Sequence, residues 1–106
     1  MRLHPKPFNK IKNGGKTSEF RINDEKRQLI KVGDSIEFTN RDSLADKFTV
    51  EVTHLKTYLS FKDLFHKTKN LHSDCKEGEF IQGMYQYYTP EEEIKYGVLE
   101  IEFKLL

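Results

Sequence analysis

Four short stretches of this chain alternate apolar and polar residues with a period of two, and they constrain the fold more than any other feature. The clearest alternation runs from 99 to 105, and the others occupy residues 17–22, 35–40 and 48–53. Such a pattern is typical of half-buried β-strands, because successive side chains of a strand point to opposite faces. Residues 1–4 predict a further short strand or an extended lead-in.

Helix signals lie between these stretches. Ser60 and Thr89 are suited to cap helices at 61–68 and 90–96, and Asn23-Asp24 can cap a short turn of helix through Leu29. Pro7 fits the first turn of a helix at 7–13. Residues 41–47 predict a polar connection, and residues 70–83 predict a loop that holds short helical turns at most.

Short helices among strands with mostly antiparallel connections favour a β-dominated α+β fold, in which a small mixed sheet curls into a barrel. At 106 residues we expect one domain spanning 1–106. No apolar run is long enough to cross a membrane, and the basic start lacks the apolar region of a signal peptide. We therefore expect a cytoplasmic location.

Charge is unevenly distributed. The net charge is +1, which gives no general attraction to nucleic acid, but residues 1–21 carry six Lys or Arg against one acid, Glu19. A local basic face is one interpretation. The other is that Lys10 and Lys12 form the solvated side of a helix whose Phe8 and Ile11 face inward.

Three charged residues, Lys16, Glu19 and Arg21, follow the glycine pair Gly14-Gly15. If residues 17–22 are extended, Glu19 and Arg21 project on the side opposite to the apolar residues of the strand. A glycine allows the backbone to turn from a helix into this strand, because it adopts a positive φ at little cost. We predict a cluster of two cations and one carboxylate.

This cluster could bind a phosphate or a polar base edge, with Arg21 giving two-pronged contacts and Lys16 a point charge. Glu19 could accept from an exocyclic amine or pair with Arg21. The alternative is an exposed salt-bridge network that contributes little to stability. Further candidates are Asn40 and Arg41, although a turn role is the simpler account of Asn40.

Aromatic rings form a second group of candidates. Tyr85, Tyr87 and Tyr88 could stack on bases, and we expect at least two of them to pack against the core, with Tyr87 the candidate for ligand contact. The four histidines and the single Cys75 show no metal-ligand spacing or nucleophile motif, and no Gly-rich phosphate loop is present. We expect no metal and no cofactor.

Several motifs carry a family resemblance. Residues 14–21 read G-x-K-x-x-E-x-R, and the lead-in Leu3-His4-Pro5-Lys6-Pro7-Phe8 with Ile11, Lys12 and Gly14 resembles the start of an ASCH domain. Similar pieces follow in order: Ile30-Lys31-Val32-Gly33-Asp34, Phe38-Thr39-Asn40-Arg41 and Tyr96-Gly97-Val98. The resemblance implies a PUA-like β-barrel flanked by helices.

It also implies an RNA or a modified nucleoside as partner, with no preference for DNA and no membrane. Some small ASCH proteins hydrolyse N4-acetylcytidine with a Lys and a Thr of this segment, and others resemble ribonucleases. In the hydrolase alternative, the catalytic residues would be Lys16, Glu19 and the hydroxyl of Thr17 or Ser18. The family's Thr lies three residues after the lysine, however, where this chain has Glu19, and a nearby carboxylate favours the charged ammonium. A protein-interaction module is the third alternative.

Overall fold

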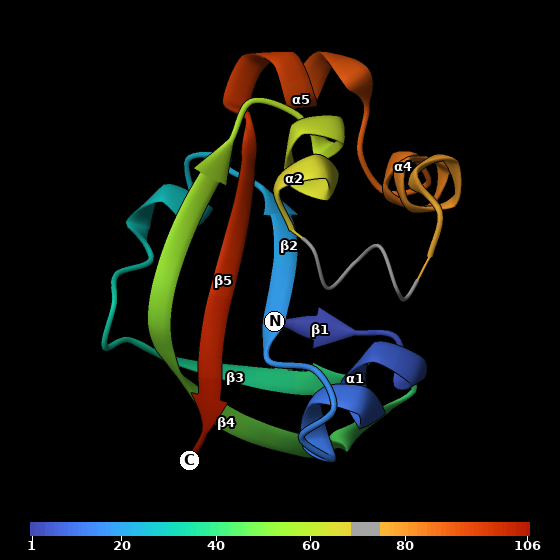
Figure 1. Cartoon of the computed structure of the whole chain (residues 1–106). Coiled ribbons are helices and arrows are strands. Elements are labelled where there is room, and N and C mark those ends of the chain that lie inside the picture. Colours follow the sequence, from blue (N-terminus) through green and yellow to red (C-terminus); the bar gives the residue numbers. More distant parts are fainter. Residues whose placement is uncertain (69–74) are drawn as a thin grey trace. The chain divides into compact units, whose positions relative to one another are not determined.

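The computed structural model describes residues 1–68 and 75–106. Figure 1 shows its elements along the chain. Their order is β1 (Arg2–Leu3), α1 (Pro5–Lys12), β2 (Ser18–Ile22), the 3-10 turn η1 (Arg27–Leu29), β3 (Ser35–Asn40), β4 (Ser43–Tyr58), α2 (Phe61–Lys67), α4 (Glu77–Tyr85), α5 (Pro90–Tyr96) and β5 (Val98–Leu105).

The five strands are hydrogen-bonded in the order β1-β3-β4-β5-β2. β1 pairs with β3 in parallel, whereas β3 and β4 are antiparallel and place Phe38 opposite Phe48. β2 and β5 are also antiparallel, because Thr17 O accepts from Phe103 N and Gly97 O accepts from Asn23 N. This mixed, strand-rich arrangement confirms the predicted α+β class and is consistent with a PUA-like fold.

The contacts of the chain divide it into two units, which we call unit 1 and unit 2. Unit 1 comprises Met1–Glu19, Ile30–Leu55 and Ile101–Leu106, and unit 2 comprises Phe20–Leu29 and Lys56–Glu100. Strands β2, β4 and β5 each contribute residues to both. The chain therefore builds each unit from segments that are distant in sequence.

Aromatic rings fill the core of unit 1. The Phe38 ring lies 5.7 Å from that of Phe48 and 5.4 Å from that of Phe103, and Phe8 of α1 packs on Phe48 at 4.9 Å. Phe8 and Ile11 are fully buried, as the helix pattern predicted. Burial of such large apolar side chains contributes about 1.5 to 3 kcal/mol each, so these contacts hold α1 in place.

Unit 2 has its own apolar cluster, composed of Phe20, Ile22, Phe61, Leu64 and Val98. Rings and aliphatic groups of α4 and its neighbours pack against it, with Phe80 lying 5.8 Å from Phe20 in an edge-on arrangement. Phe20 and Ile22 are thus inward-facing, as the alternation of the strand predicted.

Three boundaries differ from prediction. α1 begins at Pro5 rather than Pro7, because both prolines lie in the first helical turn, where the missing N–H groups have no intrahelical partner to lose. The predicted connection at 41–47 is mostly strand, since β4 starts at Ser43 and pairs with β3 across a tight turn.

The loop prediction for 70–83 is wrong over its described later part, where α4 begins at Glu77. This helix contains Gly78 and Gly83, which lower helix propensity by about 1 kcal/mol each. Its apolar residues Phe80, Ile81 and Met84 pack on the unit 2 cluster, and this tertiary contact overrides the local preference. Residues 69–74 lie outside the described part.

Candidate functional site

The end of α1 positions Lys16. Gly14 has a φ of +80°, so the chain turns back and both Gly15 N and Lys16 N donate to Lys10 O, at 2.9 and 3.2 Å. These bonds satisfy a carbonyl that the helix end would otherwise leave unpaired. Lys16 therefore follows a fixed turn that leads into β2, and this turn is the role that the sequence predicted for the glycine pair.

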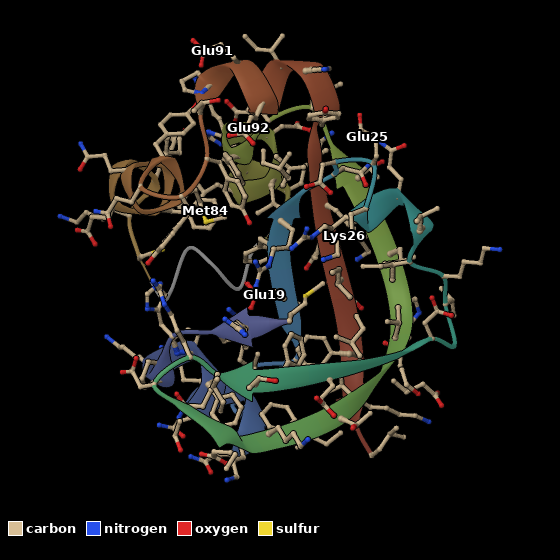
Figure 2. The ribbon with its side chains drawn as sticks, turned by 180° about the vertical axis from the view of Figure 1, so that it is seen from behind. Glu19, Glu25, Lys26, Met84, Glu91 and Glu92 are labelled. Carbon is tan, nitrogen blue, oxygen red and sulfur yellow. The ribbon has the colours of Figure 1, made fainter. Side chains whose placement is uncertain are left out.

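Within unit 1, Lys16 and Glu19 form an ion pair. Lys16 Nζ lies 3.7 Å from Glu19 Oε1, and Glu19 is 9% exposed. Figure 2 labels Glu19 on β2. The ion pair therefore joins a buried carboxyl group to a partly exposed amine.

Arg21 is two residues beyond Glu19 on β2, in unit 2. Its Nε is buried and makes no hydrogen bond with any residue in 1–68 or 75–106. Leaving a buried donor unsatisfied costs about 1 to 3 kcal/mol. Such a donor in a guanidinium group is suited to a planar acceptor such as a phosphate or a carboxylate.

Asn40 and Arg41 lie in unit 1 at the turn between β3 and β4. Asn40 is 8% exposed, and its Oδ1 accepts from Asp42 N at 3.0 Å, which is the turn role that its residue type favours. The exposed Arg41 places Nη1 3.2 Å from His4 Nε2. Parallel pairing of β1 with β3 brings His4 next to Arg41, and no local sequence pattern predicts this long-range contact.

Exposed cations surround this part of unit 1. Across the described residues, Arg2, Lys6 and Lys10 have no acidic partner within ion-pair distance, whereas Lys12 pairs with Asp46 at 2.9 Å. The interpretation of Lys10 and Lys12 as the solvated side of α1 is confirmed, because the same helix buries Phe8 and Ile11. The basic face stays a prediction.

The three tyrosines of unit 2 differ in their contacts. Tyr88 stacks on Phe61 with ring centroids 6.0 Å apart, and Tyr85 meets the same ring edge-on at 6.1 Å. Tyr87 is 60% exposed. At least two of the three rings therefore pack, as expected, and Tyr87 is the most exposed of the three residues.

Two buried carboxylates of unit 2 were missed by sequence reasoning. Glu100 is 5% exposed and accepts from Tyr58 OH at 2.9 Å, although the alternation predicts it on the polar side of its strand. Glu93 is 7% exposed and accepts from Phe61 N at 2.6 Å and from Tyr85 OH at 2.5 Å. Glu93 lies in the first turn of α5, where an acid interacts favourably with the helix dipole. That pattern does not predict that the side chain is buried.

These bonds perturb both phenols. Burial, followed by the hydrogen bond to Glu100, raises the pKa of Tyr58. The hydrogen bond to Glu93, followed by burial, raises the pKa of Tyr85. In each case the carboxylate accepts from the neutral phenol and would repel the phenolate, so the neutral form is favoured.

The hydroxyl groups needed for hydrolysis are not engaged. Thr17 is exposed, and neither its side chain nor that of Ser18 makes a hydrogen bond within the described ranges.

No group of three or more His, Cys, Asp or Glu in the described chain is arranged to hold a metal ion. None of its helices combines the length and apolar character that a bilayer crossing requires.

Comparisons with known proteins agree with the motifs. The model of the ASCH domain matches residues 1–106. The chain belongs to the ASCH domain family. Among solved structures, this ASCH domain is similar to hypothetical protein PH0355, with 32% identity, a TM-score of 0.83 and coverage of 100% of this chain and 96% of that one.

A second similar structure is protein PF0455 from Pyrococcus furiosus, solved in solution by NMR. It is 29% identical, with a TM-score of 0.73, and the match covers 100% of the ASCH domain and 98% of that chain. A search of curated proteins finds no match.

Proposed function

We propose that this ASCH domain binds RNA or a modified nucleoside through Lys16, Glu19 and Arg21, with Asn40, Arg41 and Tyr87 adding contacts. The observation that carries the proposal is the buried Nε of Arg21, which has no hydrogen-bond partner in the described chain. An acceptor atom of a ligand would supply the hydrogen bond that Arg21 Nε lacks, so binding is favoured at this residue.

Family membership supports the same conclusion, since ASCH domains generally bind RNA. Lys16, Glu19 and Arg21 fall within six consecutive residues, and strand alternation puts Glu19 and Arg21 on the same side of β2. In this proposal, Arg21 contacts a phosphate or base edge, Lys16 adds charge, and Glu19 orients the ammonium or accepts from a base amine.

Charge supports an RNA partner as well. Arg2, Lys6 and Lys10 are exposed cations of unit 1 without acidic partners in the described ranges. Phosphate neutralisation by such groups releases counterions and drives association. A cytoplasmic location, where RNA is abundant, fits this function.

The test is fluorescence anisotropy of a labelled single-stranded oligoribonucleotide of roughly 12 nucleotides, titrated with the full chain at several salt concentrations. We expect affinity to fall as salt rises. Lys16→Ala and Arg21→Ala should each weaken binding about 10-fold without a loss of fold measured by circular dichroism.

The matched control is Lys104→Ala, which removes an exposed cation that pairs with Glu51 at 3.4 Å. It should bind as the parent does. Absence of any shift at low salt would refute the RNA proposal, and release of cytidine from N4-acetylcytidine that depends on Lys16 would replace it with hydrolysis.

A further inference from the structure

The turn between α4 and α5, residues 85–88, has a fixed backbone. We call it the tyrosine turn, and Figure 2 labels Met84 before it and Glu91 and Glu92 after it. Met84 O accepts from both Tyr87 N and Tyr88 N at 3.0 Å. Thr89 then caps α5 in a reciprocal pair with Glu92, at 3.0 and 3.2 Å. Both ends of the turn are therefore held by hydrogen bonds.

Its first and last rings are held by unit 2. Tyr85 donates to Glu93 Oε1 at 2.5 Å, and Tyr88 stacks on Phe61 with an interplanar angle of 28°. Glu93 Oε2 accepts from Phe61 N at 2.6 Å, so one buried carboxylate joins the tyrosine turn to the start of α2. These contacts anchor the residues on both sides of Tyr87.

That residue is Tyr87, whose side chain is 60% exposed. A ring presented by a rigid turn loses little conformational entropy when a ligand stacks on it. The hydrogen bonds of the tyrosine turn thus fix the backbone that carries this exposed residue.

The segment around the turn is acidic, which disfavours phosphate as the group that it contacts. Between Lys76 and Lys95, the chain holds five glutamates and no lysine or arginine. Four of them, Glu77, Glu79, Glu91 and Glu92, are at least partly exposed. A negative field repels a phosphate backbone, whereas a neutral base can approach the ring face.

We propose that Tyr87 is a stacking platform for an unpaired nucleobase and that Glu93 is its positioning residue, acting through Tyr85. This inference rests on the proposed RNA or nucleoside function and adds the class of ligand. In an RNA duplex the base faces are hidden, so Tyr87 selects single strands, loops or free nucleosides.

The experiment compares a single-stranded oligoribonucleotide of roughly 12 nucleotides with the same strand annealed to its complement. We expect Tyr87→Ala to weaken binding of the single strand about 5- to 150-fold, the range that stacking of one base provides, and to leave the duplex affinity as it is. Tyr87→Phe, which keeps the ring, should retain the preference for the single strand. Ile94→Ala, which truncates a side chain 84% exposed on α5, is the matched control and should bind both ligands like the parent.

A spectroscopic readout separates stacking from a structural role. The chain has no tryptophan, so Tyr87→Trp introduces a unique fluorophore at the platform. Its emission should be quenched when the single strand is added, and little changed by the duplex. Quenching by cytidine alone would identify a free nucleoside as a sufficient ligand, and quenching by the strand alone would identify a polynucleotide.

The positioning role is tested with Tyr85→Phe, which removes the hydroxyl bonded to Glu93 and keeps the ring on Phe61. We expect single-strand affinity to fall about 2- to 10-fold, because the turn loses its preset orientation, with duplex affinity retained. Equal affinity of Tyr85→Phe and the parent for the single strand would overturn the role of Glu93.

Two outcomes would overturn the platform itself: an unchanged single-strand affinity of Tyr87→Ala, or an equal loss for single strand and duplex. Failure of the proposed function is distinct, because then the parent chain binds neither ligand, and the inference falls with it.

Discussion

The phenol of Tyr85 donates a 2.5 Å hydrogen bond to Glu93, which is buried and also accepts from Phe61 N. Tyr85 ends α4, Glu93 lies in α5 and Phe61 begins α2. One carboxylate therefore links three helices of unit 2, and its removal would leave a buried N–H group without an acceptor.

Glu93→Ala should destabilise the chain by about 3 kcal/mol, because hydrogen bonds to a charged acceptor contribute about 1.5 to 3 kcal/mol and the Phe61 N–H would be orphaned. Urea unfolding followed by circular dichroism measures the change. Glu91→Ala, which removes an exposed acid from the same helical turn, should cost less than about 0.5 kcal/mol. Equal losses for the two variants would show that Glu93 has no special role.

Stability should fall at alkaline pH. The raised pKa of Tyr85 in the folded chain means that the unfolded chain loses its phenolic proton first. The stabilisation is therefore complete below the ordinary value of 10.0 and is lost as the pH rises through the folded-state pKa. Unfolding free energies between about pH 8 and about pH 11 should fall less steeply for Tyr85→Phe than for the parent. Equal slopes of unfolding free energy against pH for Tyr85→Phe and the parent would contradict this prediction.

Gly97→Ala should be among the most damaging glycine substitutions. Gly97 has a φ of +72°, and an added Cβ would lie 2.9 Å from Tyr58 O, a backbone atom that cannot rotate away. We expect a loss of about 1 to 3 kcal/mol in the free energy of unfolding. Gly83→Ala in α4 meets open space and should instead stabilise by about 0.5 to 1 kcal/mol. Thermal unfolding of the two variants measures both changes in stability. A stabilising effect of Gly97→Ala would contradict the close approach of Tyr58 O to this position.

Lys10→Ala should reduce the salt dependence of RNA binding. If the exposed Lys10 neutralises one phosphate, the slope of log affinity against log salt becomes shallower by about 0.7 for a single strand. Anisotropy titrations at several salt concentrations measure this slope. A slope equal to that of the parent would place Lys10 outside the RNA contact.

Much of the fold could be predicted from local signals. The alternation of residues 99–105, the cap residues Ser60 and Thr89, and the stop at Gly97 predicted elements that the structure contains. These signals depend on backbone preferences and on side-chain direction, which act over a few residues. For the same reason, the turn of Gly14 before Lys16 was predictable.

The helix α4 and the buried Glu100 were not predictable in this way. α4 forms because Phe80, Ile81 and Met84 find the apolar cluster of unit 2, and that cluster is assembled from β2, α2 and β5. Glu100 is buried because the polar side of its strand is also covered and Tyr58 supplies a donor.

The sequence by itself determined the central parts of four strands, the starts of α2 and α5, the ASCH motif and the candidates Lys16, Glu19 and Arg21. Only tertiary structure decided which carboxylates are buried, which tyrosines pack and which cations lack partners. The physical reason is the separation along the chain over which each effect acts. A backbone preference acts over a few residues, whereas burial and hydrogen-bond pairing depend on segments brought together from distant parts of the chain. Tyr85 and Glu93, eight residues apart and joined only because α5 packs beside the end of α4, illustrate the second kind.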